Sequence, residues 1–312
     1  MEIRTYRAGD DVTQVSIYNE AAADLPKFKT ATLDEVRRRA HAPDYDPSTR
    51  FIALVDGRPV AYAGFRANGR VSYPWCRKDH ETAAQPLFDR VLQAMKGRGL
   101  SHAFAAYRGD WPRQLEFFQK NGFQLRREMV NFVLDIVDMP TPMARPSSTI
   151  GPATPDDVPG ILELGANLLL VRERAALEQY LFHNPYFPAD SVFVQRARTG
   201  TTPLAVGILI ANAAYANPRQ VDAAMPCFRL GAFGTEGMQC KRINGLFSFL
   251  TADTRDTNPL ALDLLGYAAY KLRDTEVETF AAQVPSDAGH LLRFHKQYFQ
   301  RQASFPILER TL

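Results

Sequence analysis

The sequence predicts an α+β protein made of two similar halves, each an α/β/α sandwich with a mixed, mostly antiparallel sheet and flanking helices. The first observation is length, because 312 residues exceed the roughly 150 typical of one domain. The second is the Pro/Ser-rich segment 138–148, whose three prolines cannot sustain a helix or a central strand. The third is that similar elements follow in the same order on both sides of it. We therefore expect domains at 1–137 and 149–312, joined by a linker at 138–148.

Composition excludes several classes of function. Hydrophobic residues make up 46% of the chain and charged residues 23%, which is typical of a globular protein with a buried core. The net charge of +3 predicts no nucleic-acid partner. No apolar run approaches the ~20 residues of a membrane span, and the N-terminus lacks a signal-peptide pattern, so we expect no membrane partner. The three cysteines fit a reducing, cytoplasmic location, and without CxxC or HExxH spacing we expect no metal site.

The elements of the first half follow from local patterns. A short strand at Ile3 leads to Asp10-Asp11, and an aspartate at such a place can cap the next helix. The Asp56-Gly57 pair between two apolar runs predicts a hairpin. The expected elements after the first helix are a helix at Thr32–His41, strands at Arg50–Phe65 (the hairpin) and Val71–Trp75, a helix at Gln85–Lys96, a strand at Ser101–Tyr107, a helix at Arg113–Lys120 and a strand at Met129–Ile136.

The second half repeats this order. It opens with a strand at Ile150 that leads to Asp156-Asp157 and a helix, and Asn258-Pro259 has the pattern of a helix N-cap and first turn. The other expected elements are strands at Ser191–Arg196, Leu204–Ala211 and Ile243–Leu250, a helix from Asn258 to Leu272, a strand at Val277–Val284, a helix at Ala288–Gln300 and a strand at Phe305–Glu309.

Two motifs carry a resemblance to a known family. Leu-Glu-Phe-Phe-Gln-Lys-Asn-Gly-Phe at 115–123 resembles the end of the fourth helix of the GCN5-related N-acetyltransferases (GNATs), and 56–64 resembles their hairpin between strands 2 and 3. Segments 294–299 and 304–307 resemble the same family more faintly. Through the order of elements, the resemblance covers nearly the whole chain, with the family fold present twice.

The resemblance implies a cosubstrate and a place for it. In GNATs two strands splay apart to hold the pantetheine arm of acetyl-CoA, and backbone amides at the start of the third helix bind its pyrophosphate, as helix N-termini bind anions in general. The motifs fit better in the first half, which favours it as the donor site. The residues that match there are Trp75, Cys76, Arg77, Thr82, Ala83, Ala84 and Phe118.

Several positions depart from the family pattern. The phosphate loop of the first half contains Asp79 and Glu81 and no glycine, and Phe118 stands where the family has a tyrosine that protonates the leaving thiolate. In the second half this position is His295, with Tyr298 one turn later, and an imidazole can carry out acid–base chemistry near neutral pH.

Other candidates have two readings each. His295 and Tyr298 are either proton donors or packed side chains, and the same holds for Tyr107, which ends a strand beside the first cleft. Cys76 is either a nucleophile or a small buried residue. The glycine-rich segment 228–249 is either an acceptor-binding loop or a long hairpin.

The sequence thus favours an acyl-CoA-dependent N-acetyltransferase that binds acetyl-CoA and lets the primary amine of a small molecule or peptide attack the thioester directly. Two alternatives stay open. The lost glycines and Phe118 also fit a catalytically degenerate binding or scaffolding protein. The tandem arrangement also fits transfer of a larger acyl group.

Overall fold

The computed structural model describes residues 1–28, 30–40, 45–145, 147, 149–165, 173–183, 190–211, 244–252, 254 and 257–312. The chain divides into two compact units. Unit 1 comprises Met1–Glu128 and Ser304–Leu312, and unit 2 comprises Met129–Ala303. This division differs from the predicted domains, because the C-terminal segment belongs to unit 1 and the expected linker at 138–148 lies within unit 2.

Unit 1 contains a sheet in the order β1-β2-β3-β4. Its strands are β1 (Glu2–Thr5), β2 (Arg50–Val55), β3 (Arg58–Gly64) and β4 (Trp75–Cys76). Asp56 and Gly57 have φ angles of 50° and 73°, as the predicted two-residue hairpin requires. The strand expected at Val71–Trp75 is shorter, because Val71 forms only an isolated bridge with Phe65.

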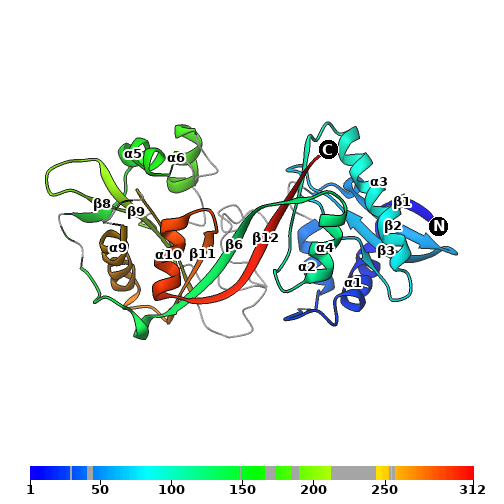
Figure 1. Cartoon of the computed structure of the whole chain (residues 1–312), viewed down its shortest axis with the longest axis horizontal. Helices are drawn as coiled ribbons and strands as arrows, with labels where there is room; N and C mark the ends of the chain where they lie inside the picture. Colours follow the sequence, from blue (N-terminus) through cyan, green and yellow to red (C-terminus); the bar gives the residue numbers. More distant parts are fainter. Residues whose placement is uncertain are drawn as a thin grey trace. The chain divides into compact units, whose positions relative to one another are not determined.

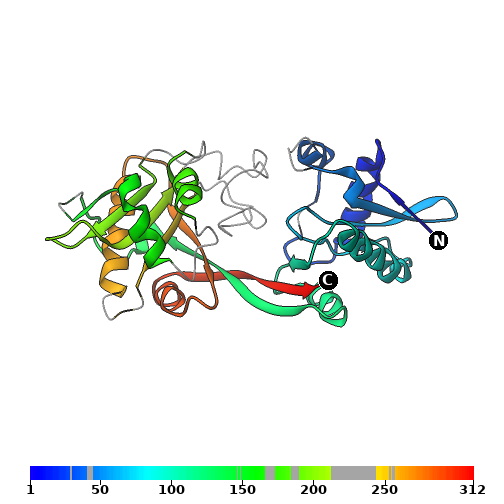
Figure 2. The same ribbon diagram turned by 90° about the horizontal axis from the view of Figure 1, so that it is seen from above.

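Helices cover both faces of this sheet (Figure 2). They are α1 (Asp10–Ala21), α2 (Leu33–Ala40), α3 (Ala84–Gly97) and α4 (Pro112–Lys120), with short 3-10 turns η1 (Pro47–Thr49) and η2 (Glu81–Ala83). Phe88 of α3 belongs to the same buried cluster as Phe51 of β2. Ile17 of α1 belongs to a different cluster, which contains Trp75 of β4. Apolar burial on both faces therefore holds unit 1 together.

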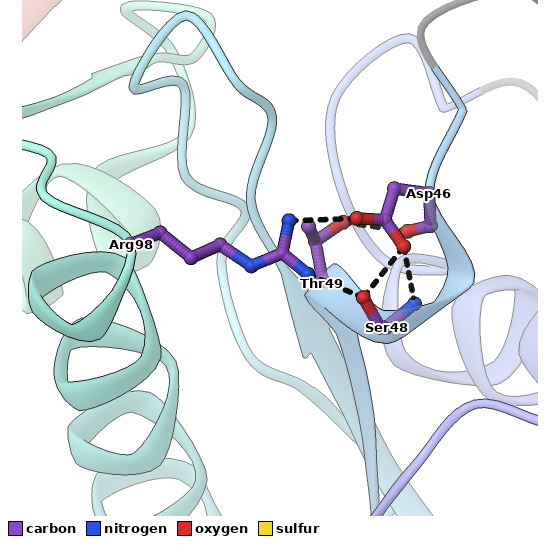
Figure 3. A network of polar contacts seen from close by, with 4 residues as sticks. All are labelled: Asp46, Ser48, Thr49 and Arg98. Atoms are coloured by element: carbon purple, nitrogen blue, oxygen red, sulfur yellow. Dashed lines mark hydrogen bonds and ion pairs between the residues drawn. The ribbon is translucent and has the colours of Figure 1, made fainter.

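A polar network ties the end of α3 to the start of β2 (Figure 3). Arg98 Nη1 donates to Asp46 Oδ2 at 2.6 Å, and Thr49 Oγ1 donates to the Asp46 carbonyl at 2.7 Å. Hydrogen bonds from Ser48, and then from Arg98, hold the pKa of Asp46 below its usual value. The network fixes the turn that leads into β2.

The C-terminal segment completes unit 1 by strand pairing. β12 (Gln300–Thr311) runs antiparallel to β5 (His102–Ala106), with Leu308 opposite Ala105. Leu308 is 1% exposed and lies in the unit 1 core with Ala103 and Ala105. A strand at the far end of the chain thus supplies backbone partners and core volume to the first unit.

Unit 2 contains a sheet in the order β6-β11-β10-β9-β8-β7. Its strands are β6 (Gln124–Asp135, from Met129 onward), β7 (Ile150–Pro152), β8 (Val192–Arg196), β9 (Pro203–Ile210), β10 (Asn244–Thr251) and β11 (Thr279–Pro285). Neighbours are antiparallel except β10 and β11, which are parallel.

Two pairs of helices pack against this sheet (Figure 1). They are α5 (Val158–Leu164) and α6 (Arg174–Phe182), then α9 (Thr257–Leu272) and α10 (Gly289–Tyr298). The first pair and the second pair bury separate apolar clusters. The segment after η3 (Ile136–Asp138) contacts α9, since the Ala144 amide donates to the Gly266 carbonyl at 3.0 Å.

The two units repeat one device near the start of their first helices, the second of which follows η4 (Pro155–Asp157). Asp10 accepts the Arg7 amide at 2.7 Å and binds Arg4. Asp157 accepts the Thr154 amide at 2.8 Å and binds Arg196. We predicted that these aspartates cap the helices. Instead, each accepts a hydrogen bond from the amide three residues earlier and forms an ion pair with an arginine.

Candidate functional site

The parallel strands of unit 2 pair over only part of their length. The residue pairs are Asn244–Thr279, Gly245–Phe280 and Leu246–Ala281, although β10 continues to Thr251 and β11 to Pro285. Farther along, β10 pairs with β9 and β11 pairs with β6. Within the described residues, the edges that β10 and β11 turn toward each other are therefore not paired beyond Leu246 and Ala281. We call residues 246–251 of β10 and 281–285 of β11 the fork.

The ring of His295 contacts one arm of the fork, β10, and the strand β6 that pairs with the other arm. It is stacked on Phe249 of β10, with ring centroids 5.4 Å apart and an angle of 18° between the planes. It also lies 5.5 Å from Phe132 of β6, which pairs with Ala282 of β11. His295 is 2% exposed. Among the described residues, the further rings that contact it are Phe294 and Phe299, so the imidazole packs against four phenylalanines.

Hydrogen bonding fixes the protonation of this imidazole. Nδ1 of His295 lies 2.8 Å from the Leu291 carbonyl, and because a carbonyl only accepts, Nδ1 carries the proton. Burial lowers the pKa of His295 to about 4, so the ring is neutral at pH 7. Nε2 is then a bare acceptor, buried and without a hydrogen-bond partner in the described structure. In this state His295 does not offer the proton that the resemblance implied.

A second buried polar atom lies at the end of β10. Thr251 is 1% exposed, and its Oγ1 has no partner among the described residues. The Thr251 carbonyl accepts a hydrogen bond from Nε2 of His290, in the first turn of α10, at 3.1 Å. Buried polar atoms are usually hydrogen-bonded. Two unpaired ones beside a break in strand pairing therefore make this region a candidate binding site.

The other candidates of the second half lie elsewhere or are only partly described. Tyr298 is half-buried, its ring lies 5.0 Å from Phe294 and its hydroxyl accepts from Gln297 at 3.1 Å. The helix predicted from the Asn258 cap begins one residue earlier, because Thr257 Oγ1 binds the carbonyls of Ala252 and Thr254 at 2.9 Å. Residues 253, 255 and 256 of the expected anion loop, and 228–243 of the glycine-rich segment, lie outside the described residues.

Comparison with solved structures decides the fold. A GCN5-related N-acetyltransferase from Sphaerobacter thermophilus matches at a TM-score of 0.62 and 13% identity, over 99% of this chain and 95% of that one. A tandem GNAT protein from the clavulanic acid biosynthesis pathway matches at 0.56 and 13%, over 99% and 98%. A GNAT-family acetyltransferase from Colwellia psychrerythraea matches at 0.52 and 11%, over 100% of both chains.

The chain has the tandem GNAT fold. This confirms the predicted α+β class and the resemblance on which it was based. No family model and no curated protein sequence matches the chain, and the structural matches share only 11–13% sequence identity with it. The resemblance implies that the fork of unit 2 is the counterpart of the splayed strands, and that α10 is the counterpart of the fourth helix.

In the GNAT fold of unit 1, aromatic side chains link the corresponding strands. The hydroxyl of Tyr107, just after β5, accepts the amide of Tyr73 at 2.6 Å. The Tyr107 ring stacks on Phe118 at 5.6 Å and 22°, and Phe118 is fully buried. Both residues, predicted for the site, thus join the segment before β4 to the end of β5 and to α4.

The remaining predicted residues on β4 are also packed. Trp75 is buried, and its ring contacts Tyr18 at 4.9 Å and Trp111 at 6.2 Å. Burial raises the pKa of the Cys76 thiol to about 12, and its Sγ lies 3.4 Å from the Pro74 carbonyl. A thiol that stays protonated is a poor nucleophile, which favours the packing role of Cys76 over the nucleophilic one.

The predicted phosphate loop of unit 1 already binds a carboxylate. Glu20 of α1 forms an ion pair with Arg77 and accepts the Lys78 amide at 3.0 Å. Arg77 also donates to Ser16 Oγ at 3.0 Å. The amides of Ala83 and Ala84 donate to carbonyls within the loop, and Thr82 is exposed in η2. This cation and these amides are therefore engaged within the protein.

The described residues contain no group of three or more side chains able to hold a metal ion. None of their helices is long and apolar enough to pass through a bilayer.

Proposed function

We propose that this protein is an acyl-CoA-dependent N-acyltransferase that uses acetyl-CoA and a primary amine, with its donor site at the fork of unit 2. The observation that carries the proposal is the fork itself. Its strands leave backbone donors and acceptors unpaired with each other, on a GNAT fold, next to the buried unpaired atoms of His295 and Thr251. A ligand with amide groups matches unpaired strand edges in the way that an added strand does.

The reaction needs orientation more than covalent catalysis. The amine nitrogen attacks the thioester carbonyl carbon, the C–N bond forms, the C–S bond breaks, and the proton lost from nitrogen ends on the thiol. Amides on the inner edge of β10 would stabilise negative charge on the carbonyl oxygen. Holding the amine beside the thioester supplies a large part of the rate.

Unit 2 is a better donor site than unit 1, although the sequence motifs favoured the first half. In unit 1 the hydroxyl of Tyr107 accepts a hydrogen bond from the Tyr73 amide. The carboxylate of Glu20 forms an ion pair with Arg77 and accepts a hydrogen bond from the Lys78 amide. Acetyl-CoA would have to displace these contacts. At the fork of unit 2, Thr251 Oγ1 and His295 Nε2 have no such partner to lose among the described residues.

Two measurements test this proposal. Titration calorimetry with acetyl-CoA should show binding, and no heat at millimolar ligand would refute the acyl-CoA assignment. Hydrogen–deuterium exchange should then show ligand-dependent protection in 244–252 and 279–285. Protection in 73–84 instead would place the donor site in unit 1. Release of free thiol only when a primary amine is present would show transfer.

A further inference from the structure

We propose that His295 is a binding residue for the acyl donor, and that its Nε2 accepts a hydrogen bond from a neutral donor group on the CoA arm. This inference rests on the proposed function, because it concerns the same fork. It assigns His295 a role opposite to that of the proton donor at the corresponding position of the family.

The direction of the hydrogen bond follows from the local geometry. The Leu291 carbonyl holds the Nδ1 proton at 2.8 Å, so the only free capacity of the ring is the lone pair on Nε2. Within the described structure that lone pair is buried and unpaired. An unpaired buried acceptor costs free energy, which a ligand that supplies an N–H or S–H group would recover.

The surroundings restrict the chemistry of the partner. The rings around His295 are those of Phe132, Phe249, Phe294 and Phe299. Burying an ammonium group among phenylalanines without a counter-charge is costly, so the acceptor substrate's charged amine is a poor partner. The pantetheine arm offers neutral groups instead, namely its amide N–H groups and the thiol of product CoA.

The position of His295 matches this ligand. Its ring contacts Phe249, which lies beyond the last β10–β11 pair at Leu246. It also contacts Phe132, which lies opposite Ala282, one residue beyond the last pair on β11. The imidazole therefore packs against residues that lie beyond the last β10–β11 pair, on β10 itself and on the strand next to β11. An arm inserted between the two strands would pass this level.

The test replaces His295 with phenylalanine, which keeps an aromatic ring and removes the acceptor. Calorimetry should show that His295→Phe binds CoA about tenfold more weakly than the wild type, the effect of one lost hydrogen bond. Its Tm without ligand should be equal or higher. The matched control is Lys296→Ala, an exposed neighbour on α10, which should bind as the wild type does.

Comparing two ligands identifies the donor group. If His295→Phe binds acetyl-CoA and CoA more weakly by the same factor, the hydrogen-bond donor is an amide N–H. If it binds only CoA more weakly, the donor is the thiol. Equal affinity of wild type and His295→Phe for both ligands would refute the role of His295 and leave the proposed function intact. No binding by the wild type would refute both.

A measurement on the wild type covers the case in which the variant does not fold. The ¹⁵N spectrum of the imidazole groups should include the signal of neutral His295 with an unprotonated Nε2, which its loss in His295→Phe assigns, and this Nε2 signal should shift on addition of CoA. An Nε2 signal unchanged at saturating CoA would overturn the proposal.

Discussion

Replacing His295 should remove a pH dependence from the stability of unit 2. Burial lowers the pKa of His295 from its ordinary 6.5 to about 4 in the folded protein, and within the described part of the chain the rings that contact it are phenylalanines. Below pH 6.5 the unfolded chain therefore binds a proton that the folded chain does not. The contribution of neutral, buried His295 to the free energy of unfolding is fully present above that pH, and it is lost as the pH drops toward 4.

The size of the effect follows from the shift. At about 1.36 kcal/mol per pKa unit, a change from 6.5 to about 4 corresponds to about 3 kcal/mol. Urea unfolding followed by circular dichroism should be measured at pH 7 and at pH 4.5. Between these pH values the wild type should lose about 2–3 kcal/mol more of its free energy of unfolding than His295→Phe loses. The carboxyl groups common to both proteins cancel in this comparison. An equal pH dependence in both would refute the description of His295 as a neutral, buried imidazole.

Two further substitutions test packing and the assignment of the units. Gly266→Ala would place a Cβ 2.7 Å from the Pro142 carbonyl oxygen and should destabilise unit 2 by about 1–3 kcal/mol in urea unfolding, whereas Gly97→Ala, which meets nothing within 4 Å, should be neutral or slightly stabilising. Tyr107→Phe removes the hydroxyl that accepts a hydrogen bond from the Tyr73 amide. It should destabilise unit 1 by about 1–3 kcal/mol without changing the affinity for acetyl-CoA. Weaker binding of acetyl-CoA would indicate that the donor site lies in unit 1.

Local elements could be predicted because their signals lie within a few residues. Asp56-Gly57 fixes the hairpin through its backbone angles, and the apolar periodicity of α3 gives its bounds to within a residue or two. The prediction was weaker for the third strand of the first half, because Val71 and its neighbours satisfy their backbone groups through bridges to Phe65 and Phe104.

The roles of the candidate site residues could not be predicted, since they depend on distant partners. His295 was identified by its place in the order of elements, but its protonation depends on the Leu291 carbonyl and on rings from β6 and β10. For Tyr107 and Arg77, the partners Tyr73 and Glu20 come from other elements. No local pattern indicates that these groups are already engaged.

The partner of the last strand is the least local feature of all. Segment 305–309 has the pattern of a strand, yet nothing in it indicates that β12 pairs with β5, about two hundred residues earlier. Leu308 is fully packed in unit 1, only a few residues from the C-terminus, where substitutions are usually tolerated. We therefore predict that Leu308→Ala destabilises unit 1 by about 2–5 kcal/mol, the cost of truncating a buried leucine.

The two tryptophans make this prediction specific to one unit. Trp75 and Trp111 both lie in unit 1, so fluorescence-detected urea unfolding reports on that unit alone. Leu308→Ala should shift this transition to lower urea, while Glu309→Ala, exposed on the same strand, should not. If the fluorescence transition is unchanged and acetyl-CoA binding is lost instead, the C-terminal strand belongs to unit 2. The chain would then divide near 138–148, as its proline content suggests.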